Sequence, residues 1–220
     1  MILNCPEKRL HPLVTISVAG DLEGKGNLSV INSLFSLLLK ADMATVKVHD
    51  KEFETFIKAE DIQRRVSELG AIINIEYNNK RPLFIGVLNG ALIFMADLVK
   101  NISVECELAF IKVSSYSGLA STGSVKNMIG LSESVKDRHV IVVEDIIDTG
   151  DTALYIINEL QKQQPASLKF AAILFKPAAL KQDIKPDYVG FEIPPDFVVG
   201  YGLDYDGLGR NLNDIYKLKA

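Results

Sequence analysis

The chain has 220 residues, of which 48% are hydrophobic and 24% are charged, and its formal net charge at pH 7 is -4. This composition is typical of a globular protein with one sizeable core. The slight excess of acidic residues gives no general attraction to nucleic acid or to anionic lipid, so we expect neither kind of partner.

The first 42 residues do not follow the pattern of the rest of the chain. Their longest apolar stretch, LSVINSLFSLLLK from Leu28 to Lys40, is shorter than the roughly 20 residues that span a bilayer and starts too deep for an ordinary signal peptide. We therefore divide the chain into residues 1–42, an N-terminal extension or a start assigned too far upstream, and one domain over residues 43–220. A chain that begins at Met43 is expected to fold, since every candidate site residue follows it.

The two cysteines, Cys5 and Cys106, lie far apart in the sequence, with no CxxC pair and no histidine cluster. This usage predicts neither a disulfide scaffold nor a zinc site. Reduced thiols in a cytoplasmic protein are the expectation.

From Met43 onward, strand and helix patterns alternate. Apolar residues at helical spacing predict helices within residues 56–77, 91–100 and 153–164, and apolar runs predict strands at 82–88, 107–113, 139–143, 168–175 and within 196–204. Apolar strands separated by helices of about ten residues indicate an α/β fold with a parallel sheet that is covered on both faces.

The segment VIVVEDIIDTGDTA, from Val140 to Ala153, places two acids directly after a buried strand. Ligands of an open parallel sheet gather outside the carboxyl ends of its strands. Glu144 and Asp145 are therefore expected at this rim, where water, a metal ion or a ligand can meet their charge.

The next residues, DTGDT, have the composition of a tight turn that enters a helix. Gly150 permits close backbone approach, Thr149 and Thr152 offer hydroxyl groups, and free N–H groups at a helix start favour anions. Acids beside such a phosphate cradle suit a phosphorylated sugar better than a bare phosphate. The simpler alternative is an acidic helix-capping turn, and neither GxxxxGK[ST] nor GxGxxG is present.

Four stretches in this order resemble the type I phosphoribosyltransferases, and among them the hypoxanthine phosphoribosyltransferases. They are GVLNGALIF, SSYSG with STG, VIVVEDIIDTGDTA, and KPDYVGFEIPPDFVVGYGLDYDGLGRNL, and together they cover the chain from about Met43 onward. The last stretch is the most specific, because it belongs to the 6-oxopurine branch. The resemblance implies a parallel-sheet fold with a small hood formed by the C-terminal segment.

For the acidic segment, the resemblance implies that Glu144 and Asp145 hold the ribose hydroxyl groups with Mg²⁺ close by. It makes Asp148 the general base, which takes or shares the purine N7 proton while N9 attacks the anomeric carbon. It assigns the 5′-phosphate to the main chain and hydroxyl groups of Asp148, Thr149, Gly150, Asp151 and Thr152.

Leu88, Asn89 and Gly90 match the family's pyrophosphate loop, which contains a non-proline cis peptide. Some relatives carry lysine where Asn89 stands, so Mg²⁺ and Arg210 would have to help neutralise the pyrophosphate here. Asp204 matches an acid near Mg²⁺. The alternative is that Asn89 and Gly90 form an ordinary strand-to-helix turn.

The polar stretch SSYSGLASTGSV suits a surface loop, and the resemblance makes Ser115 and Tyr116 part of a lid that excludes water. Lys176 matches the donor to the purine O6, although a lone lysine at a strand end is usually only solvated. Phe197 matches the ring that stacks on the purine, and Val198 matches the residue whose main chain contacts the base edge. Without the resemblance, the sequence FVV would suit a strand of the core.

The implied reaction transfers the 5-phosphoribosyl group from 5-phosphoribosyl 1-diphosphate to hypoxanthine, and to guanine, with Mg²⁺, in a homodimer or homotetramer. In this family, main-chain groups largely recognise the purine 2-position, so the sequence does not exclude xanthine as a further substrate. A type I enzyme for another base should lack the pattern of Lys176 and Phe197. A nucleic-acid-binding regulator of this fold should show a basic face or an added binding module, and the sequence shows neither.

Overall fold

The computed structural model describes residues 44–116 and 125–219, except for the side chains of residues 114–116 and 125–127. In this part of the chain no helix has the length and apolar character that spanning a membrane requires.

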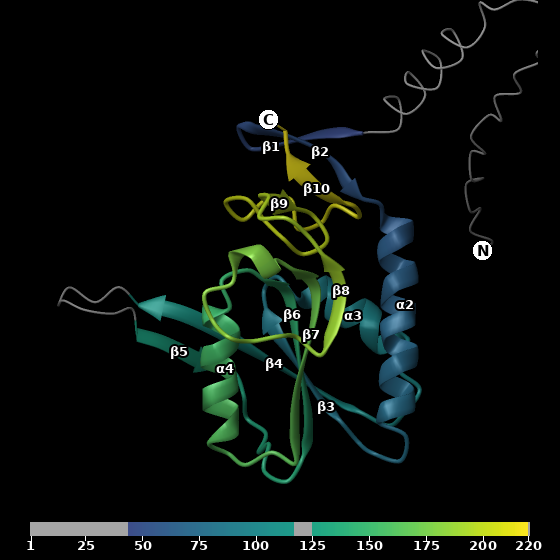
Figure 1. Ribbon diagram of the computed structural model, residues 1–220, viewed down its shortest axis with the longest axis vertical. Coiled ribbons are helices and arrows are strands. Elements are labelled where there is room, and N and C mark those ends of the chain that lie inside the picture. Colours follow the sequence, from purple (N-terminus) through teal and green to yellow (C-terminus); the bar gives the residue numbers. More distant parts are fainter. Residues whose placement is uncertain (1–43, 117–124, 220) are drawn as a thin grey trace, which may run out of the picture. The chain divides into compact units, whose positions relative to one another are not determined.

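A six-stranded sheet forms the centre of the domain (Figure 1), in the order β5-β4-β3-β6-β7-β8. Its strands from β3 to β8 run parallel, and β5 is an antiparallel edge strand beside β4. The strands are β3 (Leu83–Leu88), β4 (Glu107–Tyr116), β5 (Val125–Ile129), β6 (His139–Ile147), β7 (Ser167–Phe175) and β8 (Tyr188–Glu192).

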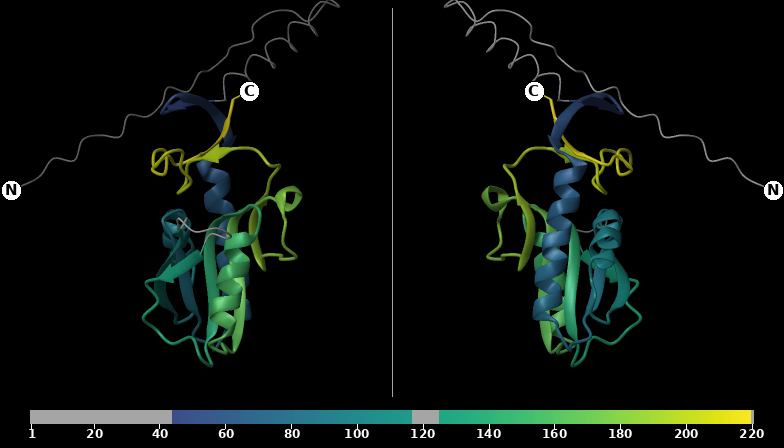
Figure 2. Two further views of the ribbon diagram at one scale, coloured as in Figure 1. Left: turned by 90° about the vertical axis from the view of Figure 1, so that its left-hand side faces the viewer. Right: turned by 90° about the vertical axis from the view of Figure 1, so that its right-hand side faces the viewer.

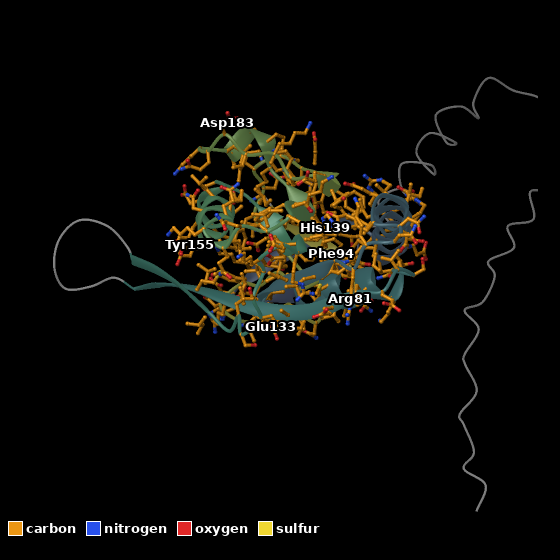
Figure 3. All side chains as sticks on the ribbon, turned by 90° about the horizontal axis from the view of Figure 1, so that it is seen from below. Arg81, Phe94, Glu133, His139, Tyr155 and Asp183 are labelled. Atoms are coloured by element: carbon orange, nitrogen blue, oxygen red, sulfur yellow. The ribbon has the colours of Figure 1, made fainter. Side chains whose placement is uncertain are left out.

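Helices cover the sheet on both faces. Helices α2 (Ala59–Glu76) and α3 (Leu92–Lys100) bury apolar residues against one face, and α4 (Asp151–Gln161) covers the other, while a short 3-10 helix, η1 (Pro177–Ala179), follows β7. In Figure 3, Phe94 of α3 lies among the interior side chains, whereas Asp183 lies at the edge of the molecule. The predicted α/β class with a central parallel sheet is confirmed.

A second sheet lies at one end of the central sheet (Figure 2) and forms the hood. It has the order β1-β2-β10-β9, with β1 (Thr45–Val48), β2 (Lys51–Ile57), β9 (Val198–Val199) and β10 (Ile215–Leu218), and all its pairings are antiparallel. The C-terminal segment therefore supplies only half of the hood. The β1–β2 hairpin, which the sequence pattern did not reveal, supplies the other half.

Two predicted boundaries change. Strand β6 continues past Val143 to Ile147, because Ile146 and Ile147 still pair with Leu174 and Phe175 of β7. The polar stretch expected as a loop from Ser114 instead starts inside β4, whose last residues pair with β5. Residues 117–124 of that stretch lie outside the described residues.

Candidate active site

Two adjacent acids occupy the carboxyl end of β6. Glu144 is only 5% exposed, and burial together with the neighbouring Asp145 carboxylate raises its pKa well above the ordinary value. Burial also raises the pKa of Asp145, to about 6, although the Ile146 N–H donates to its Oδ1 at 3.0 Å and Arg210 lies close enough to oppose the shift. Each carboxylate thus lacks full charge compensation in the ligand-free protein.

The turn after β6 opens onto a cavity of about 230 Å³. Helix α4 begins at Asp151, directly after Gly150, whose φ of 85° is the left-handed conformation that glycine favours. The first N–H groups of a helix have no partner within it, so this helix start suits an anion. The cavity is lined by Glu144, Ile146, Ile147, Asp148, Thr149, Gly150, Thr152 and Ala153.

The turn is held by its own side chains. The Thr149 hydroxyl donates to Asp151 at 3.1 Å, and Gln182 donates to the other Asp151 oxygen at 2.7 Å. Asp151 is exposed and is not among the residues that line the cavity, so its carboxylate serves to hold the turn. The predicted contact of Asp151 with the 5′-phosphate therefore stays a prediction for its main chain.

Lys176 and Asp148 form an ion pair at the ends of neighbouring strands. Because β6 and β7 are parallel and Ile147 pairs with Phe175, the next residue of each strand lies side by side. The Lys176 Nζ lies 3.0 Å from Asp148 Oδ2. The Lys176 side chain is 8% exposed and that of Asp148 is 47% exposed, so the cation is buried and the acid is accessible.

The loop after β3 contacts the acidic pair. The peptide bond between Leu88 and Asn89 is cis, as the resemblance implies. A Cβ on Gly90 would lie 1.6 Å from Asp145 Oδ2, so only glycine allows this approach. A Cβ on Gly202 of the hood would lie 2.1 Å from the Gly90 carbonyl oxygen. Loop, acids and hood therefore meet at Gly90.

Arg210 and Asp204 face this junction from the hood. Arg210 Nη2 lies 2.5 Å from Asp204 Oδ1, and Nη1 donates to the Gly202 carbonyl at 2.6 Å. Asp204 also accepts the Gly207 N–H at 2.7 Å. Arg210, to which the resemblance assigns the pyrophosphate, thus has the Asp204 carboxylate and the Gly202 carbonyl as its partners in the free protein.

Phe197 lies in the hood and is 43% exposed, as a stacking platform requires. The Tyr205 ring packs edge-on against it at 5.7 Å between centroids, and the Lys51 ammonium lies 5.7 Å from the Phe197 centroid. Val198 is buried, and its main chain pairs with Lys217 of β10.

The acidic side chains at the carboxyl end of β6 and in the hood suit a cation that binds together with the substrate. Among the described residues no group of three or more acids, histidines or cysteines could hold a metal alone. Mg²⁺ commonly uses one or two carboxylates together with substrate phosphates and water. Glu144, Asp145 and Asp204 are oxygen donors of this kind. The raised pKa values of Glu144 and Asp145 mean that their ionised forms are disfavoured in the free protein, a cost that a bound cation would offset.

Two predicted residues cannot be placed fully, and two others were missed. The main chain of Ser115 and Tyr116 lies in β4, but their side chains lie outside the described part. Gly202 and Gln182, which contact Gly90 and Asp151, were not predicted. The sequence GYGLD carried a signal for Gly202, since an isolated glycine in a strand pattern indicates close backbone approach.

Comparison with known proteins agrees with this geometry. Residues 55–206 match the family model described as the phosphoribosyl transferase domain. Fold and site thus define the chain as a phosphoribosyltransferase.

The hypoxanthine-guanine phosphoribosyltransferase of Bacillus subtilis is 48% identical over 172 residues, covering 78% of this chain and 95% of the relative. That of Lactococcus lactis is 44% identical over 172 residues, covering 77% and 93%. The crystal structure of a Staphylococcus aureus hypoxanthine phosphoribosyltransferase has a TM-score of 0.71 at 38% identity, covering 83% of this chain and 95% of that one. The chain belongs to the hypoxanthine-guanine phosphoribosyltransferase family.

Proposed function

We propose that this protein is a purine salvage enzyme that transfers the 5-phosphoribosyl group from 5-phosphoribosyl 1-diphosphate to hypoxanthine and guanine. The products are the nucleoside 5′-monophosphates IMP and GMP, with pyrophosphate as the leaving group. Membership of the family supports the reaction, and the site supports an assignment of roles to residues.

The observation that carries the proposal is which charged side chains the fold buries. Within residues 44–116 and 125–219, the two charged side chains in the buried class are Glu144 and Lys176, at 5% and 6% exposure. Burying a charge is costly unless a partner compensates it. Both belong to one site. Lys176 is paired with Asp148 at 3.0 Å, whereas the neighbour of Glu144 is another acid that raises its pKa, which is the arrangement expected when a ligand compensates the Glu144 charge.

In the proposed reaction, the purine N9 forms a bond to the anomeric carbon while the bond from that carbon to pyrophosphate breaks. In the free protein Lys176 and Asp148 hold each other at 3.0 Å. On base binding, the ammonium donates to the purine O6, which leaves Asp148 free to accept the N7 proton. The pair thus keeps both groups oriented before the base arrives.

The remaining residues bind the sugar diphosphate. The start of α4, with the main chain and hydroxyl groups of residues 148–152, holds the 5′-phosphate, and Glu144 and Asp145 accept hydrogen bonds from the ribose hydroxyl groups. Leu88, Asn89, Gly90 and Arg210 bind the pyrophosphate. Glu144, Asp145 and Asp204 would hold Mg²⁺, which supplies charge neutralisation for the diphosphate when bound.

Purified protein incubated with sugar diphosphate, Mg²⁺ and one base at a time tests this proposal. Hypoxanthine and guanine should give nucleotide and pyrophosphate, adenine should give little, and xanthine measures the latitude at the 2-position. Omission of Mg²⁺ should abolish turnover. Absence of nucleotide with every base would refute the proposed function.

We also infer a cytoplasmic homodimer or homotetramer. Large apolar side chains stay about half exposed on α3, β4 and β5, at Leu92, Leu108 and Ile129, which suits burial against another copy. Cys106 is a free thiol, in keeping with a reducing compartment. Light scattering coupled to size-exclusion chromatography measures the oligomeric state, and a monomer at micromolar concentration would contradict the inference.

A further inference from the structure

The hood and α3 are joined by a hydrogen bond from Tyr201 to Asp97. The Tyr201 hydroxyl donates to Asp97 Oδ2 at 2.9 Å, and the tyrosine is 3% exposed. The same carboxylate accepts Gln63 Nε2 at 2.7 Å and Lys100 Nζ at 3.0 Å. Burial opposes ionisation of Asp97, but these donors outweigh it and hold the pKa of the carboxyl below its ordinary value.

Tyr201 lies in a tight turn of the hood, Gly200–Leu203, which we call the hood turn. Gly200 and Leu203 exchange main-chain hydrogen bonds at 3.0 and 3.1 Å. The two central residues have positive φ angles, 49° at Tyr201 and 100° at Gly202. The turn therefore has a defined shape, and its side-chain anchor is Tyr201.

The hood turn contacts the pyrophosphate loop at its next residue. Gly202 packs so closely on the Gly90 carbonyl that a Cβ would come within 2.1 Å of it. The Gly202 carbonyl also accepts Arg210 Nη1 at 2.6 Å, and its N–H donates to the Arg210 carbonyl at 3.0 Å. Arg210 is thus bound to the hood turn through both its side chain and its main chain.

Asp97 is fixed relative to the same loop from the other side. Helix α3 begins at Leu92, two residues after Gly90, and its first residue is tied back by the Leu92 N–H to the Asn89 carbonyl at 3.3 Å. Tyr201, Asp97 and Arg210 line one cavity of about 290 Å³. The hydrogen bond from Tyr201 to Asp97 therefore joins the hood turn to the helix that follows the loop.

We propose that Tyr201 and Asp97 are positioning residues for the diphosphate, which place Gly202 and Arg210 over the Leu88–Gly90 loop. The inference rests on the proposed function of this site. Neither residue touches the substrate. We expect the effect on the diphosphate, because Lys176 and Asp148 sit on the central sheet. Phe197 and Val198, the hood residues that serve the base, are held by pairing with β10 outside the hood turn.

Y201F removes the hydroxyl and keeps the ring. Asp97 retains Gln63 and Lys100 as donors, so no charge is left without a partner and the variant should fold. Because this hydrogen bond is made to a charged group, we expect KM for the sugar diphosphate to rise about tenfold, which corresponds to about 1.4 kcal/mol. KM for hypoxanthine should stay within about twofold of the wild-type value, since the base-binding residues Phe197 and Val198 are held by β10 and not by Tyr201.

Y188F is the matched control. Tyr188 is also buried, and its hydroxyl donates to a carboxylate, Glu76 Oε2, at 2.5 Å, but it lies on β8 and not in the hood. This variant should lose stability without raising KM for the sugar diphosphate. D97A should behave as Y201F, and D97N should recover most of the loss, because its amide oxygen can still accept the tyrosine hydroxyl.

Amide hydrogen exchange gives a readout that does not depend on turnover. In Y201F, exchange at Gly202 and Leu203 should become faster than in the wild type, while exchange in β6 and β7 should not change. Equal rises in both KM values, an effect of Y188F equal to that of Y201F, or unchanged exchange at the hood turn would each overturn the positioning role. Wild-type protein without transferase activity would instead overturn the proposed function.

Discussion

Replacing Asp145 by Asn should stabilise the ligand-free protein while it removes binding of the sugar diphosphate. The Asp145 carboxyl is buried beside Glu144, and its pKa rises from the ordinary 3.8 to about 6. Asn keeps the shape of the side chain and can still accept the Ile146 N–H that lies 3.0 Å from Oδ1. What the substitution removes is a charge that the folded protein accommodates poorly.

The magnitude follows from proton linkage. Because the folded state binds this proton more tightly than the unfolded state, the stabilising contribution is fully present below pH 3.8 and is lost as the pH rises through about 6. With about 1.36 kcal/mol per pH unit, a shift of this size corresponds to about 3 kcal/mol. D145N should therefore match the wild type only below pH 3.8, and should exceed its free energy of unfolding by about 1 kcal/mol at pH 4.5 and by about 3 kcal/mol at pH 8.

Urea unfolding of both proteins between pH 4.5 and 8, without Mg²⁺ or phosphate, measures this difference. D183N, at an exposed acid (Figure 3), is the control and should differ from the wild type by an amount that does not change with pH. Mg²⁺ with sugar diphosphate should then stabilise the wild type and not D145N. A D145N protein that is no more stable than the wild type at pH 8 would refute the reasoning.

Three further substitutions test single residues. D148N should lower kcat by about 10²- to 10⁴-fold. KM for the sugar diphosphate should change little, since the phosphate cradle is mostly main chain. Single-turnover kinetics measure the effect, and an unchanged kcat would remove Asp148 from the mechanism. K176A should erode the preference for hypoxanthine over adenine, measured as the ratio of kcat/KM values, and a preserved ratio would mean that another group reads the 6-position. G90A places a Cβ 1.6 Å from Asp145 Oδ2, so KM for the sugar diphosphate should rise at least tenfold, and isothermal titration showing wild-type affinity would contradict the close packing.

Local patterns predicted the central sheet well. The long apolar periodicities of α2 and α4 and the continuous apolar runs of β3, β6 and β7 are signals of buried elements, and all five appear in the structure. The pairing of Lys176 with Asp148 also follows once the two strands are parallel neighbours. The resemblance supplied most roles, and the structure adds the contacts among the residues that carry them.

The hood could not be predicted in the same way. Its β1–β2 hairpin turns at His49 and Asp50, with a positive φ at His49, and this pair lacks the Asn-Gly or Asp-Gly signal of a two-residue turn. Strand β9 has two residues and β10 has four, too few for a clear alternation. Their partners are distant in sequence, so only the folded chain reveals that β10 lies between β2 and β9.

The hood's origin in two distant segments determines the order in which the enzyme can be completed during synthesis. The Ala59 N–H at the start of α2 donates to the Asp214 carboxylate, a residue translated 155 positions later. Every strand of the central sheet precedes β9 and β10 in the chain, so β2 has only β1 as a neighbour in its sheet until these last two strands are available. A nascent chain can therefore build the phosphate cradle and the Lys176–Asp148 pair first, and gains Arg210 and the pairing of β2 with β10 last.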